Sequence, residues 1–572
     1  MNLKSGNSIT KTFIWFLIVW GGLNLLQAFL TPINPDEAYY WMYSKYLAWG
    51  YFDHPPMIAI MIRVGDMIFH NELGVRFLVV VSQIGALWII WGLIDEEQSL
   101  KKGTLYIFMM LVAVLPVFNI YGFIATPDAP LLFFTAVFLL LYKRFLKEES
   151  WKNTLLLGVS MACLVYSKYH GVLLIIIVLL SNLKLLKSPK FYTASILGVI
   201  LFIPHLLWQY SNDFPSVKYH LVDRVSGFVI GNVPQYLLNL LLIHNPFILP
   251  VCIWLIVKSK PKNQFEKTLS YIIAGFIVFF FISSFRYRVE PQWTALISVP
   301  MIILLLRNPG FETRFGSYVK WVTIFFLPVL LFIRIAFMVD FLPVSYLKKG
   351  YHNSRERAIE ISKIAGDRPV VFTNSYQDAS KYTFYTGKFA HTLDNLNYRK
   401  NQYDLWDFEE KIHGKEVLYV PHFLTDYIRD NFTKQIFSTG DSAYVKVYKD
   451  FQSLQRECVI LIDKSYNYTI SNTNSIHLKI FNPYPFQINL SNKVFPVVFE
   501  IGFFKNGRLE FTKRLIFPES ILTLKAGETI STDCSFSLEG QAPGKYKIAI
   551  CSESGIQYIT INSAFREATV VD

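Results

Sequence analysis

Titratable side chains are concentrated in the segment 31–57, TPINPDEAYYWMYSKYLAWGYFDHPPM, directly after the first apolar run. The segment contains three carboxylates, Asp36, Glu37 and Asp53, and the imidazole of His54. Charged groups beside a membrane are costly and are retained mainly where they pair or take part in function. A carboxylate can remove a proton from an acceptor hydroxyl, and nearby cations can stabilise a leaving group. We therefore interpret this segment as a candidate catalytic loop.

The same residues also have structural interpretations. Asp36 and Glu37 could cap a helix, because acids favour helix N-termini, and His54 could belong to the rigid turn that its two following prolines form. Because three acids lie within one short loop, we favour a functional interpretation of the carboxylates over a structural one. For His54 the functional and the structural interpretation are equally supported. Most aromatic residues of the segment suit anchoring at the membrane interface, but Tyr39 and Tyr40 lie beside the acids and are candidate substrate contacts.

Long apolar runs must position this loop. The chain has 572 residues, of which 52% are hydrophobic, and its mean hydropathy of +0.33 is above the usual range for soluble proteins. Runs long enough to cross a ~30 Å hydrocarbon core lie at 12–31, 73–94, 104–124, 129–146, 153–168, 170–184, 190–208, 234–257, 268–284, 291–306 and 320–341. The sequence therefore predicts a polytopic helical membrane protein with about eleven transmembrane helices, the first retained because no cleavage site follows it.

Basic residues are distributed unequally among the links between these runs. With the N-terminus inside, the inner links hold 18 Lys and Arg and the longer outer links hold 8. The positive-inside rule then places the segment 31–57 on the outer face of the membrane.

Although the net charge is +13, only 17% of residues are charged and the basic ones cluster in short links, which argues against nucleic-acid binding. The five cysteines form no CxxC pair, so neither a zinc ribbon nor a disulfide scaffold is indicated.

Further polar residues fall on the predicted outer face. The second to fifth outer loops contribute, in chain order, Asp128, Lys168, Tyr169, His220, Arg224, Arg286, Arg288, Glu290 and Trp293. Asp128 could be a first-turn acid of a helix, and Lys168 could extend to the interface from the end of a span. Arg286 and Arg288 lie on the side where basic residues are scarce, and a phosphate or carboxylate partner is the simplest reason.

Carboxylates that face cations at the mouth of a membrane bundle suit attack on a sugar carbon whose leaving group is a lipid phosphate. The sequence has no GxxxxGK[ST] and no GxGxxG after a strand, which disfavours ATP and nucleotide-sugar chemistry, and it has neither HExxH nor GxSxG. Two other functions are considered. A secondary transporter would place ionisable residues near the middle of the membrane in repeated halves, and a non-catalytic scaffold would only present the C-terminal region to a partner.

The order of the motifs PDEAYYW, YFDHPPM, TPDAPLLFF, SKYHG and RVEPQW resembles the C-type (GT-C) membrane glycosyltransferases of the protein O-mannosyltransferase-like superfamily, which includes the aminoarabinose transferase that acts on lipid A. The resemblance covers roughly residues 10–340. It implies an inverting transferase in the cytoplasmic (inner) membrane, with its active site on the outer, periplasmic face. The implied donor is a sugar on a polyprenyl phosphate, and the acceptor is an extracytoplasmic lipid, envelope glycan or protein.

The resemblance also implies roles for individual residues. Asp36 matches the catalytic base, with Glu37 beside it, and Asp128 matches the acid of the second outer loop. Lys168 matches a lysine near the donor phosphate, and the adjacent Tyr169 is included among the substrate contacts.

A second subsite follows from the same resemblance. Asp53 matches a metal-binding position, which implies a divalent ion such as Zn, Mg or Mn. His220 is its candidate partner and Arg224 a candidate phosphate clamp. His54 stands where the aminoarabinose enzyme has a lysine.

From about residue 342 the composition becomes that of a soluble protein. The range 342–455 mixes helix-like and strand-like stretches, which predicts an α/β domain. The range 456–572 contains short alternating runs between turn residues, which predicts a β-sandwich-like domain. Together with a membrane domain over 1–341, this gives three domains, the last two on the outer face. The sandwich carries no obvious catalytic cluster, which favours a structural or partner-binding role.

Overall fold

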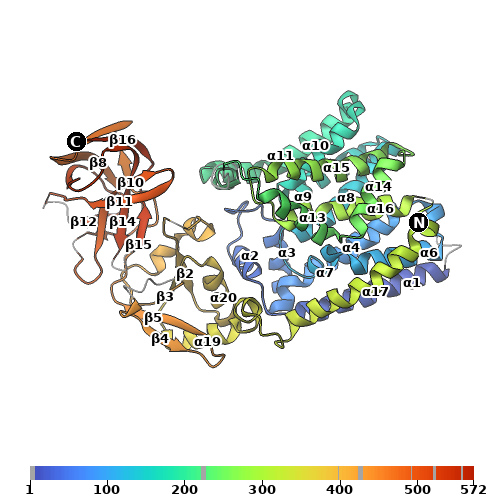
Figure 1. The fold of residues 1–572 in the computed structure, drawn as a ribbon, viewed down its shortest axis with the longest axis horizontal. Helices are drawn as coiled ribbons and strands as arrows, with labels where there is room; N and C mark the ends of the chain where they lie inside the picture. The colour runs from blue at the N-terminus through green and yellow to red at the C-terminus, as the bar shows by residue number, and fades with distance from the viewer. Residues whose placement is uncertain are drawn as a thin grey trace. The chain divides into compact units, whose positions relative to one another are not determined.

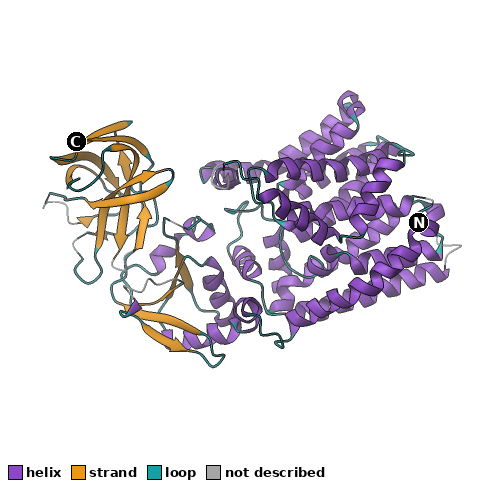
Figure 2. Ribbon diagram, in the orientation of Figure 1, coloured by secondary structure: helices purple, strands orange, loops and turns teal. Residues whose placement is uncertain are grey.

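The computed structural model of the chain describes residues 7–220, 227–308, 310–396, 398–422, 429–490, 492–518, 523–554 and 558–572. The chain forms two compact units, Met1–Ser354 and Arg355–Asp572, and each is described by itself. The first unit is helical and the second contains the strands (Figures 1 and 2).

The N-terminal half of the helical unit begins with a long helix and two short ones that carry the candidate loop. The helices are α1 (Asn7–Leu30), α2 (Pro35–Lys45), α3 (Met57–Asp66), α4 (Glu72–Leu93), α5 (Glu96–Ser99), α6 (Lys102–Val114), α7 (Pro116–Ile120), α8 (Asp128–Lys147), α9 (Trp151–Ser167) and α10 (His170–Ser181). In Figure 1, α2 lies at the end of this unit opposite the N-terminus of the chain.

The remaining helices complete the unit. They are η1 (Leu183–Lys187), α11 (Pro189–Ser211), α12 (Pro215–Lys218), α13 (Asn232–His244), α14 (Ile248–Lys258), α15 (Gln264–Ser284), η3 (Pro291–Ile297), α16 (Ser298–Arg307), α17 (Phe311–Met338), α18 (Ser345–Leu347) and η4 (Lys348–His352). Several begin at capping side chains, because a side-chain oxygen there accepts a hydrogen bond from an orphan backbone N–H. Asn71, Ser150, Ser188 and Asn263 cap α4, α9, α11 and α15 in this way.

All eleven predicted apolar runs are largely helical, but not all are single helices of spanning length. Among the described residues, α1, α4, α8, α11, α15 and α17 are long and apolar enough to cross a membrane, and α13 with α14 would be a seventh, bent by 96°. The count of eleven transmembrane helices is therefore not confirmed. An average of hydropathy along the chain does not detect where a helix ends inside an apolar run. Pro116 starts a new helix within one such run, and Asn245, whose φ is 66°, separates α13 from α14 in another.

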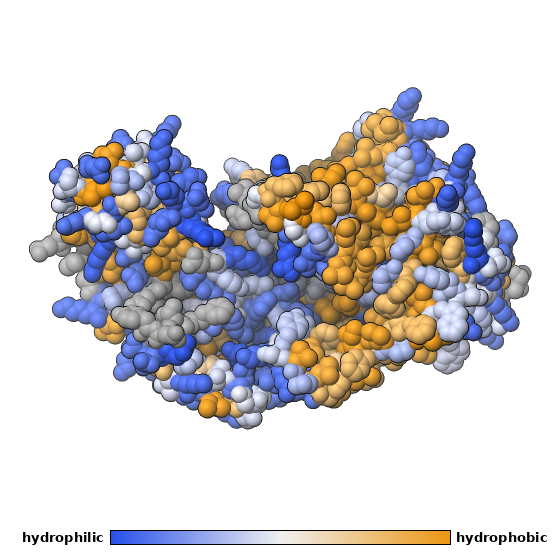
Figure 3. Space-filling view, in the orientation of Figure 1, coloured by the Kyte–Doolittle hydropathy of each residue, from blue (hydrophilic) through white to orange (hydrophobic). Residues whose placement is uncertain are grey.

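Burial differs between the long helices. In the most apolar part of α8, 61% of residues are buried inside the unit, against 22% in α11 and α17. The exposed residues of α11 include Val199, Ile200, Leu206 and Leu207. Exposed apolar residues in this number fit helices that face lipid, and Figure 3 shows broad hydrophobic surface over the helical unit.

The second unit begins with an α/β region. It contains α19 (Ser354–Ala365, which starts at the boundary residue) and α20 (Tyr376–Thr386), the short helices η5 (Gln402–Asp404) and η6 (Asp407–Lys411), and the strands β1 (Val370–Thr373), β2 (Ala390–Leu393), β3 (Val417–Pro421), β4 (Thr433–Ile436) and β5 (Ser442–Tyr448). The strand order is β2-β1-β3-β5-β4, and β1 pairs in parallel with both β2 and β3. β5 is antiparallel to β3.

Two packed layers of strands complete this unit. The strands are β6 (Val459–Leu461), β7 (Ser465–Thr469), β8 (Thr473–Phe481), β9 (Ile488–Asn489), β10 (Val497–Lys505), β11 (Arg508–Arg514), β12 (Thr523–Leu524), β13 (Thr529–Ser537), β14 (Gly544–Ser554), β15 (Tyr558–Ile561) and β16 (Arg566–Val571). One sheet has the order β11-β10-β14-β16-β7, and a second has β13-β8-β6. Strand β8 alternates strictly between exposed and buried residues, as a strand with one core face must. The last strand of the α/β region, β5, ends at Tyr448, and the first strand of the sandwich, β6, begins at Val459. The predicted boundary at 455 falls between these two strands.

Candidate active site

Asp36 lies in the first turn of α2. The side chain of Asn34 accepts a hydrogen bond from the Asp36 backbone N–H at 2.8 Å, and the Glu37 carboxylate accepts one from the Asn34 backbone N–H at 2.9 Å. This reciprocal arrangement is a capping box. Asp36 is half-buried, and it lies at the positive end of the helix dipole.

Glu37 is fully buried in an ion pair with Arg76 of α4, which is also fully buried. The guanidinium donates from Nε to Oε1 at 2.8 Å and from Nη2 to Oε2 at 2.5 Å. Arg76 also donates to the backbone carbonyls of Ala28, Thr31 and Pro32. Buried charges persist where pairing and hydrogen bonds compensate for lost hydration. This geometry favours a positioning role for Glu37, rather than the catalytic role predicted beside Asp36.

The same carboxylate reaches the second outer loop. Oε1 of Glu37 accepts a hydrogen bond from the backbone N–H of Ala125 at 2.7 Å. Ala125 belongs to the short connection that leads into Asp128, the first residue of α8. One buried side chain therefore connects the loop that carries Asp36 with the loop that carries Asp128.

Asp128 and Lys168 form a buried ion pair. The Lys168 ammonium donates to Oδ1 of Asp128 at 2.7 Å, and the two residues are 5% and 3% exposed. Lys168 follows α9 as its C-cap residue, so the pair brings the second and third outer loops together. A buried ion pair contributes little net stability. Because this pair also lies beside other site residues, we interpret it as functional.

Tyr121 lies between α7 and α8. Burial raises the pKa of its hydroxyl, and the charges of Asp128, Glu290 and Asp36 raise it further.

Asp53 lies in a second subsite lined by tyrosines. Its Oδ2 accepts hydrogen bonds from the hydroxyls of Tyr39 at 3.0 Å and Tyr43 at 3.3 Å. Burial raises the pKa of Tyr43, and the nearby Tyr39 and Asp53 raise it further, so this phenol remains a donor at neutral pH. The rings of Tyr40 and His54 lie 5.8 Å apart. Tyr39 is therefore fixed to a candidate site residue and is not a simple interfacial anchor.

A chain of hydrogen bonds supports this subsite from α11. His205 Nδ1 lies 2.7 Å from the carbonyl oxygen of Trp49, and its Nε2 lies 2.9 Å from the hydroxyl of Tyr169. Because a carbonyl only accepts, Nδ1 carries the hydrogen and Nε2 accepts from the Tyr169 hydroxyl. Gln209 donates to both Tyr169 and Ser216, and Ser216 Oγ lies within hydrogen-bond distance of two carbonyls just before Asp53.

His220 lies beside the Asp53 segment. Its Nε2 is 3.4 Å from the backbone carbonyl oxygen of Asp53, and its ring is 6.1 Å from that of Tyr169. The structure thus brings the two predicted metal ligands into one neighbourhood, although the contact uses the backbone of Asp53. Arg224, the predicted phosphate clamp, lies outside the described residues.

The fifth outer loop contributes residues of mixed exposure. Arg288 Nε lies 3.7 Å from Oε1 of Glu290, and the Arg288 side chain is 68% exposed. The ring of Trp293 lies 5.6 Å from that of His170, next to the third loop. Arg286 is exposed just after α15. Trp293 therefore lies against the third loop, while Arg286 and Arg288 are exposed.

Comparisons with known proteins show what the chain and its fold resemble. Residues 53–208 match the family described as dolichyl-phosphate-mannose-protein mannosyltransferase. Over 229 residues, 38% of the chain, it is 26% identical to the lipid A galacturonosyltransferase RgtD of Rhizobium johnstonii, and the match spans 46% of that protein. Two crystal structures of ArnT from Cupriavidus metallidurans superpose with TM-scores of 0.57 and 0.56 at 12% and 13% identity, covering 76% and 77% of this chain and 98% of each ArnT chain.

This chain has the fold of the two ArnT structures. The resemblance that the five sequence motifs predict is thereby confirmed at the level of the fold. The matched range 53–208 holds Asp53, Asp128 and Lys168.

The divalent metal that the sequence resemblance implies would need ligands from the helical unit. Across the described residues, no group of three or more His, Cys, Asp or Glu side chains is arranged to hold a metal ion. Asp53 and His220 would supply two ligands, and the Asp53 carboxylate already accepts two tyrosine hydroxyls. The divalent metal therefore stays a prediction, and no step of the reaction is derived through it.

The helical unit also contains polar residues to which the sequence assigned no role. Arg334 of α17 is buried and donates to the side chains of Gln27, Asn119 and Asn24. Its position inside an apolar run was visible, but its partners lie on helices far away in the chain. Tyr121 carried no signal either, because its role depends on acids that come from three other segments.

Proposed function

We propose that this chain is an integral-membrane inverting glycosyltransferase that moves one hexose or pentose unit from a polyprenyl-phosphate donor to an extracytoplasmic acceptor. The observation that carries the proposal is that buried Glu37 joins the loop of Asp36 to the loop of Asp128, whose carboxylate pairs with Lys168, in a chain with the fold of ArnT. The relatives point in the same direction, because one is named a lipid A galacturonosyltransferase and one ArnT structure holds undecaprenyl phosphate.

Asp36 is the proposed base. It removes the proton from the acceptor hydroxyl, the freed oxygen attacks the anomeric carbon, and the bond to the donor phosphate breaks with its electron pair on the phosphate oxygen. No covalent sugar–enzyme intermediate is required. Asp36 suits this task better than Glu37, because it is half-buried, whereas Glu37 is fully buried and both of its oxygens already accept hydrogen bonds.

Lys168 is the proposed electrostatic stabiliser of the departing phosphate. Its ammonium is held at a defined position by Asp128, and a preorganised cation in a water-poor site stabilises developing negative charge without reorganisation. Asp128 acts as a positioning residue for Lys168. Tyr39, Tyr40, Tyr169, His54, Arg286, Arg288, Glu290 and Trp293 remain proposed substrate contacts.

The base assignment can be tested with Asp36→Asn in purified protein. We expect consumption of lipid-linked sugar to fall by about 10²–10⁴-fold, while the folding transition stays near that of the wild type. Glu97→Gln is the matched control, because that carboxylate is 84% exposed and lies on the predicted inner face. Full turnover by folded Asp36→Asn protein would overturn the assignment, and a product of retained anomeric configuration would overturn the inverting mechanism.

The proposed orientation places the site and residues 355–572 on the outer face of the cytoplasmic membrane. Of the five native cysteines, four are buried and Cys163 is intermediate in exposure, so introduced cysteines can be labelled selectively. Arg508→Cys should react with a membrane-impermeant reagent in spheroplasts, and Glu97→Cys should not. The opposite pattern would reverse the orientation. Uptake of substrate into vesicles without glycosyl transfer would instead indicate a transporter.

A further inference from the structure

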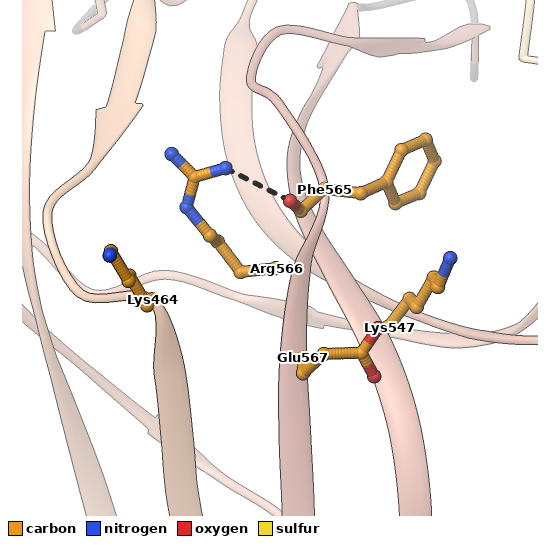
Figure 4. Close-up of a pocket in the computed structure, with 5 residues that line it drawn as sticks. All are labelled: Lys464, Lys547, Phe565, Arg566 and Glu567. Atoms are coloured by element: carbon orange, nitrogen blue, oxygen red, sulfur yellow. Dashed lines mark hydrogen bonds between the residues drawn. The ribbon is translucent and has the colours of Figure 1, made fainter.

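Charged side chains gather at the start of β16, but they do not form one binding site. In Figure 4, Lys464 and Arg566 lie on one side of the strand, and Phe565 and Lys547 lie on the other. A contact of more consequence lies within the helical unit, where the segment that follows α17 reaches the helix of the proposed base.

The residue that makes this contact is Tyr351, in η4. Its hydroxyl accepts a hydrogen bond from Nδ2 of Asn34 at 2.5 Å, across 317 residues of sequence. The same Asn34 side chain caps α2, because its Oδ1 accepts a hydrogen bond from the Asp36 backbone N–H at 2.8 Å. Since an amide has one accepting oxygen and one donating nitrogen, the two bonds together fix the orientation of the Asn34 amide. One side chain therefore joins Tyr351 to the first turn that carries Asp36.

Tyr351 is itself held in place by the end of α17. It is 3% exposed and packs in a small apolar cluster with Ala336 and Leu347. Its ring centroid lies 5.0 Å from that of Phe337. Nε2 of His352 lies 3.1 Å from the backbone carbonyl oxygen of Ala336, and because a carbonyl only accepts, the imidazole donates this hydrogen bond. The Tyr351 hydroxyl is therefore presented to α2 from a fixed position.

The backbone of this segment has an uncommon conformation. η4 is a π-helical turn, and the backbone N–H of Asn353 donates to the carbonyl of Lys348 at 2.8 Å. Such turns are rare and occur frequently at functional sites. The turn lies outside the range 10–340 that the sequence resemblance covers and outside the family match at 53–208. Neither the motifs nor the family match therefore assigns it a role.

We propose that Tyr351 is a positioning residue for Asp36 and acts through Asn34. This inference rests on the proposed function, in which Asp36 removes the proton from the acceptor hydroxyl. Asn34 orients the first turn of α2, and Tyr351 keeps the Asn34 amide from turning away from the Asp36 N–H. The base must be held closely, because a misplacement of about 1 Å can slow a reaction by about 10²-fold. The segment between α17 and the second unit thereby becomes part of the support of the active site.

Tyr351→Phe tests this role, because it removes only the hydroxyl and keeps the packed ring. With polyprenyl-phosphate sugars from an envelope lipid extract as the donor, kcat should fall by about 10–100-fold, while KM for the donor changes by less than about twofold. Hydrogen exchange followed by mass spectrometry should become faster in the range 33–40, which holds the first turn of α2, and the unfolding transition should stay unchanged.

Tyr142→Phe is the matched control. Tyr142 is also fully buried, and its hydroxyl also accepts a hydrogen bond from an asparagine amide, that of Asn182 at 3.4 Å. This variant should leave both kcat and the exchange of the range 33–40 as they are in the wild type.

A double-variant cycle isolates the hydrogen bond between the two side chains. Asn34→Ser keeps a capping oxygen for the Asp36 N–H, but it has no amide that could donate to Tyr351. In that background Tyr351→Phe should therefore slow turnover no further. A further loss as large as that in the wild-type background would overturn the proposal.

Unchanged kcat or unchanged exchange in folded Tyr351→Phe protein would also overturn it. Failure of the proposed function gives a different result. Full turnover by Asp36→Asn removes the base and this inference with it, whereas an inactive Asp36→Asn beside a fully active Tyr351→Phe removes this inference alone. If the wild type consumes no lipid-linked sugar, the proposed function fails, and hydrogen exchange still decides whether Tyr351 holds the first turn of α2.

Discussion

Arg76→Met should destabilise the membrane unit more than any substitution of an exposed arginine. It removes one partner of a fully buried ion pair and leaves the Glu37 carboxylate without its counter-charge. Breaking a buried pair in this way costs about 3–5 kcal/mol. The backbone carbonyls that accept from Arg76 at 2.5–3.0 Å also lose their donor. Arg63→Met is the matched control, because Arg63 is exposed on α3 and should change stability by less than about 0.5 kcal/mol.

The double variant Glu37→Gln with Arg76→Met tests the pair directly. Because it removes both charges, it should be more stable than the sum of the single effects predicts, by about 1–3 kcal/mol. Denaturant unfolding in detergent measures stability, and lipid-linked sugar transfer is followed on the same samples. Transfer should fall in both single variants, because Glu37 connects the loops of Asp36 and Asp128.

Two results would refute this reasoning. In the first, Arg76→Met unfolds at the same denaturant concentration as Arg63→Met, so that the buried pair does not support the fold. In the second, Glu37→Gln abolishes transfer by more than about 10³-fold with unchanged stability. The latter result would restore a direct chemical role for Glu37.

The remaining predictions concern pH, the second ion pair and metal. Burial raises the pKa of Glu409 to about 7, so between about pH 4.5 and 7 the unfolded state releases a proton that the folded state keeps. Stability of residues 355–572 should therefore fall by about 3 kcal/mol as pH rises through this window, and Glu409→Gln should remove the dependence seen in unfolding curves. Lys168→Met should cost about 3–5 kcal/mol, and adding Asp128→Asn should recover stability but not transfer. If the divalent ion that the sequence resemblance implies is required, chelation should abolish transfer and Mg²⁺, Mn²⁺ or Zn²⁺ should restore it, whereas full activity of metal-free protein would exclude it.

The positions of the candidate site loops were predictable because hydropathy and charge are linear signals. Apolar runs mark helices, and the excess of Lys and Arg in alternate links assigns the faces. Asp36, Asp128 and Lys168 could thus be assigned to one face before any contact was known. Helix breaks such as those at Pro116 and Asn245 were not recovered, since a window of apolar residues has the same mean hydropathy whether or not the helix bends.

Contacts between distant segments could not be predicted in this way. Adjacent acids in one motif proved to have different environments: the first turn of α2 leaves Asp36 half-buried, while Glu37 faces Arg76, 39 residues further along the chain. The roles of Tyr121 and His205 likewise depend on partners from other loops. The sequence by itself therefore determined the membrane class and the family motifs, and it predicts the face on which the polar residues lie. Only the tertiary structure decided which carboxylate is buried and paired and which stays accessible, because that choice depends on the direction of each side chain within the packed helices.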